Sequence, residues 1–207
     1  QDMMRLVALE SWRHRAIVIG ENLGTVPEGF NEQIARAGML GMDVLWFTRE
    51  GGWPGAPFKA PGDWSRQALA TTTTHDLPTV AGWWRGTDIR WRAELGLLAE
   101  GRDAGTEEAE RGQDRTRLWE DLGITGLVDP GGPVPQEAPV TEVLDFVART
   151  RAPLLVVPLE DMLGLVEQPN LPGTVDTHPN WRRRMPLLVE SLFEEPGAAS
   201  RTVLLGR

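Results

Sequence analysis

Four short apolar runs of strand length alternate along this chain with longer stretches that are typical of helices. The runs cover residues 16–20, 42–47, 68–73 and 154–158. Near-continuous apolar strands that alternate with helices are typical of a parallel sheet covered by helices. The sequence therefore predicts an α/β fold with about four parallel strands.

The predicted helices cover residues 6–15, 140–150 and 181–193, and a polar, mostly helical region runs from 79 to about 123. A capping box, Thr25-Val26-Pro27-Glu28, predicts a further helix that reaches about Ala37. The Pro/Gly-rich residues 129–139 are expected to form an internal loop rather than a domain linker. We therefore expect one domain, residues 1–207, with a helical insertion at about 79–150.

The length of 207 residues is short for a complete α/β barrel, which usually needs about 250 residues. The first residue is Gln1, which is unusual for an intact gene product and suggests processing or a piece of a longer protein. No basic segment followed by an apolar one opens the chain, and no apolar run approaches the roughly 18 residues of a membrane span. We therefore expect a cytoplasmic protein with no membrane partner.

The charge and residue usage exclude several classes of function. A net charge of -9 argues against nucleic acid as a partner. The chain has no cysteine, which excludes disulfides, thiolate metal sites and a cysteine nucleophile. The three histidines, His14, His75 and His178, lack metal-ligand spacing, so we expect no metal site.

Two of the apolar runs stop on ionisable side chains. Residues 16–20 lead directly into Glu21, and the threonines at 71–74 lead into His75 and Asp76. Side chains at the carboxyl ends of parallel barrel strands face the active site, and two carboxylates there suit acid/base chemistry on an uncharged polar substrate such as a sugar. A structural alternative stays open for each carboxylate, because Glu21 is placed to cap or pair locally and Asp76 is placed to cap the next helix.

Other polar and aromatic residues fit the same hypothesis. Nine tryptophans occur without a tyrosine, and a tryptophan face can stack on a sugar ring, although core packing is the alternative for most of them. Asn170 lies in an irregular stretch after the last predicted strand, where barrel loops form the site, so we expect it to line the sugar-binding cleft. The alternative is a purely structural turn over residues 170–174.

Three segments together resemble one known family, the amylomaltases, which are bacterial 4-alpha-glucanotransferases. Ile19-Gly20-Glu21-Asn22-Leu23-Gly24-Thr25-Val26-Pro27 resembles their acid/base segment. Thr74-His75-Asp76-Leu77-Pro78-Thr79, followed by Gly82-Trp83-Trp84, resembles their second catalytic segment. The C-terminal signature is matched by Leu159-Glu160-Asp161-Met162-Leu163-Gly164, Glu167-Gln168-Pro169-Asn170-Leu171-Pro172-Gly173-Thr174 and Pro179-Asn180-Trp181-Arg182-Arg183. The matches follow the family order from near residue 1 to about residue 195.

The resemblance implies a retaining transglycosylase on a (β/α)8 barrel, of which this chain is the C-terminal half. It implies that Glu21 is the general acid/base, that Asp76 stabilises the transition state and that His75 holds the sugar. The family's nucleophilic aspartate lies in an Arg-x-Asp segment after the fourth strand, and nothing here matches it. Asn22 also departs from the usual aspartate. The implied substrates are maltooligosaccharides or other α-1,4-glucans, with no cofactor, and the chain alone is expected to be inactive.

Two other hypotheses stay open. One is a different α-amylase-superfamily enzyme, such as a glucan hydrolase or isomerase, against which the C-terminal signature speaks. The other is a non-catalytic truncated polypeptide that binds glucan.

Overall fold

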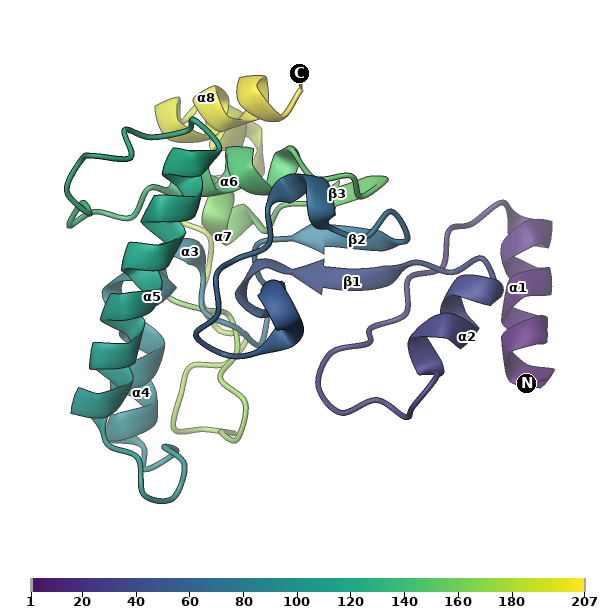
Figure 1. Ribbon diagram of the computed structural model, residues 1–207, viewed down its shortest axis with the longest axis horizontal. Coiled ribbons are helices and arrows are strands. Elements are labelled where there is room, and N and C mark those ends of the chain that lie inside the picture. The colour runs from purple at the N-terminus through teal and green to yellow at the C-terminus, as the bar shows by residue number, and fades with distance from the viewer. Residues whose placement is uncertain (1, 207) are drawn as a thin grey trace.

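The computed structural model describes residues 2–206 as a small parallel sheet with helices around it (Figure 1). The strands are β1 (Gly41–Val44), β2 (Ala68–Thr71) and β3 (Leu154–Val156), in the order β1-β2-β3. The helices are α1 (Asp2–His14), α2 (Phe30–Arg36), α3 (Val80–Arg85), α4 (Thr87–Glu94), α5 (Ala104–Ile124), α6 (Val140–Ala148), α7 (Leu159–Met162) and α8 (Pro196–Leu205). The predicted α/β class with a parallel sheet is therefore confirmed.

The predicted first strand, residues 16–20, is a single parallel bridge rather than a strand. Ile19 pairs with Leu40, and the Leu40 amide donates to the Val18 carbonyl at 3.0 Å. Ile17 and Ile19 are 65% and 38% exposed, so this apolar segment is not buried on both faces as its sequence suggested. Within residues 2–206 it has one neighbour in the sheet, which explains both the exposure and the short pairing.

The register aligns the three strands closely. Met42 of β1 pairs with Leu69 of β2, which pairs with Leu154 of β3. β2 is central and buried along its whole length. The loop that follows β2 therefore starts from the central and most buried strand of the sheet.

Helices α3, α5 and α6 pack into the main core together with β2, while α1 and α2 lie at the other side of the molecule (Figure 1). α6 contributes four almost fully buried apolar residues, Val143, Leu144, Phe146 and Val147. By contrast, α1 has no buried residue, and Trp12 on it is 79% exposed.

One predicted helix starts later than expected, and another is wrong. The helix predicted to reach about Ala37 is present as α2, but the capping box at residues 25–28 does not start it, because α2 begins at Phe30 after Gly29, whose φ of 75° is left-handed. The predicted helix at residues 181–193 is replaced by an irregular segment, a 3-10 helix (Val189–Glu194) and then α8. Trp181 has a φ of 59°, and Pro186 cannot continue a helix, so the chain cannot be helical there.

No helix in the described part of the chain combines the length and the apolarity that a membrane crossing requires.

Candidate functional site

The loop after β2 is held in place by its threonines. Thr73 Oγ1 donates to the Pro78 carbonyl at 2.8 Å, and Thr79 caps α3 by accepting from the Gly82 amide at 2.9 Å. The same Thr79 hydroxyl donates to the Leu165 carbonyl at 2.7 Å. These bonds join the loop both to α3 and to the segment after α7. The run of threonines therefore fixes the backbone on which His75 and Asp76 stand.

His75 and Asp76 project from this loop as a pair. His75 Nε2 lies 3.4 Å from Asp76 Oδ1, and their side chains are 52% and 44% exposed. Asn170 joins them from the distant segment after α7. Its Nδ2 donates to Asp76 Oδ1 at 2.6 Å, and its backbone amide donates to the His75 carbonyl at 3.2 Å. Three of the four predicted site residues therefore lie together.

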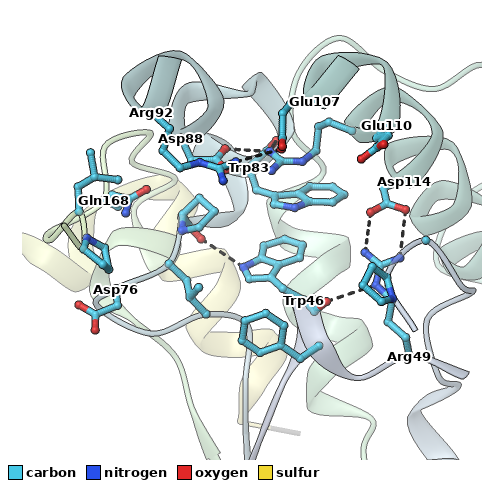
Figure 2. Close-up of a pocket in the computed structure, with 18 of the residues that line it drawn as sticks. Trp46, Arg49, Asp76, Trp83, Asp88, Arg92, Glu107, Glu110, Asp114 and Gln168 are labelled. Atoms are coloured by element: carbon cyan, nitrogen blue, oxygen red, sulfur yellow. Dashed lines mark hydrogen bonds and ion pairs between the residues drawn. The ribbon is translucent and has the colours of Figure 1, made fainter. Parts of the chain in front are cut away.

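A cavity of about 600 Å³ opens beside Asp76. Figure 2 shows Asp76 at one end of it and the Arg49–Asp114 pair at the other, with the rings of Trp46 and Trp83 between them. These two rings are stacked, with centroids 4.5 Å apart and planes inclined by 13°. Phe47 and Trp53 also line the cavity and are 54% and 72% exposed, so aromatic faces are open to a ligand.

Charged residues on α4 and α5 form the wall of this cavity away from the sheet. Arg111 binds Asp88 through two hydrogen bonds of 2.9 Å and lies over the Trp83 ring at 4.7 Å. Arg49, 5% exposed, binds Asp114 through bonds of 3.1 and 2.8 Å. Paired charges of this kind offer both hydrogen-bond donors and acceptors, which suits the hydroxyl groups of a neutral sugar.

Glu21 stands apart from this group. It is exposed and is not among the residues that line the cavity beside Asp76. Because Ile19 pairs with Leu40, Glu21 lies beside the start of β1, whereas Asp76 comes after the end of β2. Within residues 2–206, Glu21 therefore does not share with Asp76 the cavity of about 600 Å³.

Asn22 fixes the backbone next to Glu21. Its Oδ1 accepts from the Met42 amide at 2.8 Å, and its Nδ2 donates to Asn31 Oδ1 at 2.9 Å. A Cβ on Gly41 would lie 3.1 Å from the Asn22 amide, so glycine at 41 leaves room for this contact. Asn22 thus ties the Glu21 turn to the edge of β1.

A second cavity, of about 550 Å³, is lined by Thr73, Thr74 and His75 of the loop after β2. Trp181 lies there with its ring centroid 5.3 Å from that of His75, and Arg183 is nearby, bonded to Glu167 at 3.1 Å. Trp181, Arg183 and Arg184, from the segment predicted as a helix at 181–193, therefore line this second cavity.

Asp161 is a buried carboxylate that the sequence reading assigned no role. It is 1% exposed and accepts hydrogen bonds from Thr72 Oγ1 at 2.5 Å and from the Val80 amide at 2.7 Å. Burial raises the pKa of Asp161 to about 6, although these two hydrogen bonds act in the opposite direction. Asp161 therefore links the end of β2 to α3 at a cost in desolvation.

We expect Asp161→Asn to gain stability relative to the wild type as the pH rises from 4 to 7. Between an unfolded value of about 3.8 and a folded value of about 6, the folded chain holds a proton that the unfolded chain has lost. The wild-type free energy of unfolding therefore falls through this window, by an amount on the order of 3 kcal/mol. The asparagine variant lacks this titration.

Urea unfolding at pH 4, 5.5 and 7, followed by tryptophan fluorescence, measures the difference. Asp129→Asn, in an exposed loop, is the matched control for removing a carboxylate. A difference between Asp161→Asn and the wild type that stays constant with pH would contradict the buried, proton-binding state of Asp161.

Gln168 and Asn180 also support the site and were not singled out from the sequence. Gln168, 3% exposed, donates to the Asn170 carbonyl at 2.6 Å, and Asn180 Oδ1 accepts from the Leu171 amide at 2.9 Å. Their only sequence signal was membership of the C-terminal signature. Within residues 2–206, no three His, Asp or Glu side chains converge as metal ligands.

These features define an α/β protein with a candidate ligand-binding site. The site is a polar and aromatic cavity beside the loop that follows β2. The sequence model of a family described as 4-alpha-glucanotransferase matches residues 1–189. The chain therefore belongs to the 4-alpha-glucanotransferase family, as the resemblance predicted.

Individual relatives agree with this assignment. A 4-alpha-glucanotransferase of Mycobacterium tuberculosis is 37% identical over 206 residues, which cover 96% of this chain and 28% of the relative. The amylomaltase structure from Corynebacterium glutamicum superposes with a TM-score of 0.81 at 30% identity, covering 96% of this chain and 30% of that one. The amylomaltase from Streptococcus agalactiae in complex with acarbose shares the fold, with a TM-score of 0.55 at 21% identity, covering 91% of this chain and 32% of that one. This chain thus spans less than a third of these relatives.

Proposed function

We propose that residues 1–207 supply two of the catalytic carboxylates of a 4-alpha-glucanotransferase. The parent enzyme, meaning the complete polypeptide that carries this chain, would cleave an α-1,4-glucan and pass the glucanosyl group to the 4-hydroxyl of another glucan or of glucose. The observation that carries the proposal is Asp76, paired with His75, at a cavity of about 600 Å³ that Asp76 lines, in a chain that belongs to this family.

The roles follow from retaining chemistry. Glu21 protonates the departing glycosidic oxygen and then deprotonates the incoming hydroxyl, while a carboxylate nucleophile holds the covalent intermediate. Asp76 stabilises the positive charge of the oxocarbenium-like transition state. His75, half exposed beside Asp76, binds a sugar hydroxyl. These steps need proton transfer and a carboxylate, so the reaction requires no cofactor.

We propose that the described sheet is part of a (β/α)8 barrel. The segment at 18–20, β1, β2 and β3 would be its fifth to eighth strands, residues 79–150 its helical insertion, and 1–207 a single partial domain. The parallel order supports this proposal. So does the outer edge of the 18–20 segment, which has no partner within residues 2–206. A further strand pairing there would extend the segment and carry Glu21 toward the carboxyl end of the sheet.

Maltooligosaccharides or other α-1,4-glucans are the proposed substrates. The cavity supports this class because it offers aromatic faces for stacking and paired charges for hydroxyl groups. The Streptococcus agalactiae amylomaltase was solved with acarbose. Nucleic acid and membrane are not proposed as partners, given the net charge of -9, and the cytoplasmic location stays a prediction.

Product analysis of the parent enzyme with maltotriose tests the proposal. A glucanotransferase yields glucose together with a ladder of longer maltooligosaccharides. Glucose and maltose without a ladder would indicate a hydrolase instead, and binding of maltoheptaose without turnover would indicate a non-catalytic polypeptide.

A further inference from the structure

Asp76 is a carboxylate that depends on neighbours for its orientation. It stands on a loop beyond the end of β2, and its side chain is 44% exposed. Such a side chain, left alone, would occupy several rotamers. Both of its side-chain contacts in the described part of the chain, to Asn170 and to His75, use Oδ1. These contacts fix the orientation of the carboxylate, and they leave Oδ2 able to face a ligand.

Asn170 is itself held on three sides. Its carbonyl accepts from Gln168 Nε2 at 2.6 Å, and its amide donates to the His75 carbonyl at 3.2 Å. The next residue, Leu171, donates its amide to Asn180 Oδ1 at 2.9 Å. The 2.6 Å bond from Asn170 Nδ2 to Asp76 therefore comes from a fixed donor rather than from a mobile loop.

The side-chain amide of Asn180 has a defined orientation, because its oxygen faces hydrogen-bond donors and its nitrogen faces acceptors. Its Oδ1 accepts from a backbone amide, and its Nδ2 donates to the Thr174 carbonyl at 3.1 Å. His178, which is 0% exposed, lies with Nδ1 2.7 Å from the same Oδ1, so Nδ1 must carry the proton. The hydrogen bonds that Asn180 makes with His178 and with the Leu171 amide thus anchor the residue next to Asn170 in the interior.

We propose that Asn170 is the positioning residue for Asp76, and that Gln168 and Asn180 hold it in place for that purpose. This role rests on the proposed function, in which Asp76 stabilises the transition state. It refines the expectation that Asn170 lines the cleft, because Asn170 is not among the residues that line the cavity beside Asp76, although Leu171 and Pro172 are, and its Nδ2 donates to the Asp76 carboxylate. Misplacing a catalytic group by about 1 Å can cost on the order of 10²-fold in rate.

The test is a double-mutant cycle in the parent enzyme, with maltotriose and with α-maltotriosyl fluoride as a reactive donor for slow variants. We expect Asn170→Ala to lower kcat about 10- to 100-fold with KM changed less than about twofold. Asn170→Asp keeps the shape but loses the donor, so it should lose at least as much. In an Asp76→Asn background, Asn170→Ala should cost nothing further. Gln113→Ala, which removes an exposed amide on α5, is the control.

Three results would overturn the positioning role. A raised KM with unchanged kcat would make Asn170 a sugar-binding residue. A loss in the Asp76→Asn background as large as in the wild type would make its role independent of Asp76. Normal activity of Asn170→Asp would show that shape alone matters. A parent enzyme that forms no glucan ladder would instead refute the proposed function, on which this role depends.

Discussion

Glu21→Gln in the parent enzyme is expected to lower the disproportionation of maltotriose by about 10³- to 10⁴-fold. General acid/base catalysis contributes about 10²–10⁴-fold to a step, and a retaining transfer uses the same residue in both of its steps. The substitution should leave the melting temperature nearly unchanged, because Glu21 is exposed and the anchoring contacts of its turn belong to Asn22.

The control for this variant is Glu28→Gln, which alters an exposed glutamate in the same loop. It should retain the wild-type rate and product ladder. A Glu21→Gln enzyme with a near-normal rate and the same products would remove Glu21 from the mechanism.

The 207-residue chain expressed alone is expected to have no glucanotransferase activity. The proposed nucleophile lies outside it, and Glu21 does not line the cavity that Asp76 lines. Without a covalent intermediate, a retaining transfer has no route. Exposed apolar residues on α1, with Met3 80% and Trp12 79% exposed, and the unpaired sheet edges within residues 2–206 also favour association over a working site.

Incubation of the pure chain with maltotriose, followed by measurement of glucose and of longer glucans, checks this prediction. The parent enzyme at equal concentration is the positive control. A clear ladder from the chain alone would mean that a carboxylate within residues 1–207 acts as the nucleophile. Asp76 would then be the first suspect, and the role assigned to it here would be wrong.

The sequence predicted the parts of the fold that local patterns determine. The apolar run at 68–73 became β2, and the amphipathic run at 140–150 became α6. The run at 16–20 was predicted as a buried strand, yet Ile17 is 65% exposed, because pairing on both sides of a strand depends on residues far away in sequence. The helix predicted at 181–193 failed because Asn180 is used to hold Leu171, and the backbone turns at Trp181.

Some residues of the candidate site could also be predicted from local sequence patterns, and others could not. His75 and Asp76 could be found because they follow an apolar run directly, and Asn170 because it lies in an irregular stretch after the last strand. The buried position of Asp161 could not be predicted, since its partner Thr72 is 89 residues away in the sequence. The cavity wall on α4 and α5 could not be predicted either, because Arg111 and its partner Asp88 are 23 residues apart in a region that the sequence shows only as polar and mostly helical. Nine tryptophans suggested sugar stacking, but Trp46, Trp64, Trp83 and Trp84 are buried, leaving Trp53 as an exposed one at the cavity.

The central claim is that Glu21 is the acid/base, that Asp76 stabilises the transition state, and that the nucleophile lies outside residues 1–207. Trapping the glycosyl-enzyme tests this claim most directly. Glu21→Gln parent enzyme is mixed with α-maltotriosyl fluoride, whose fluoride departs without acid catalysis, while the missing base slows release of the glucan from the enzyme. Peptide mapping by mass spectrometry then locates the attached sugar. We predict a labelled aspartate outside residues 1–207, with the peptides that contain Glu21 and Asp76 unlabelled. A sugar attached to Asp76, or to any other carboxylate within residues 1–207, would contradict the account.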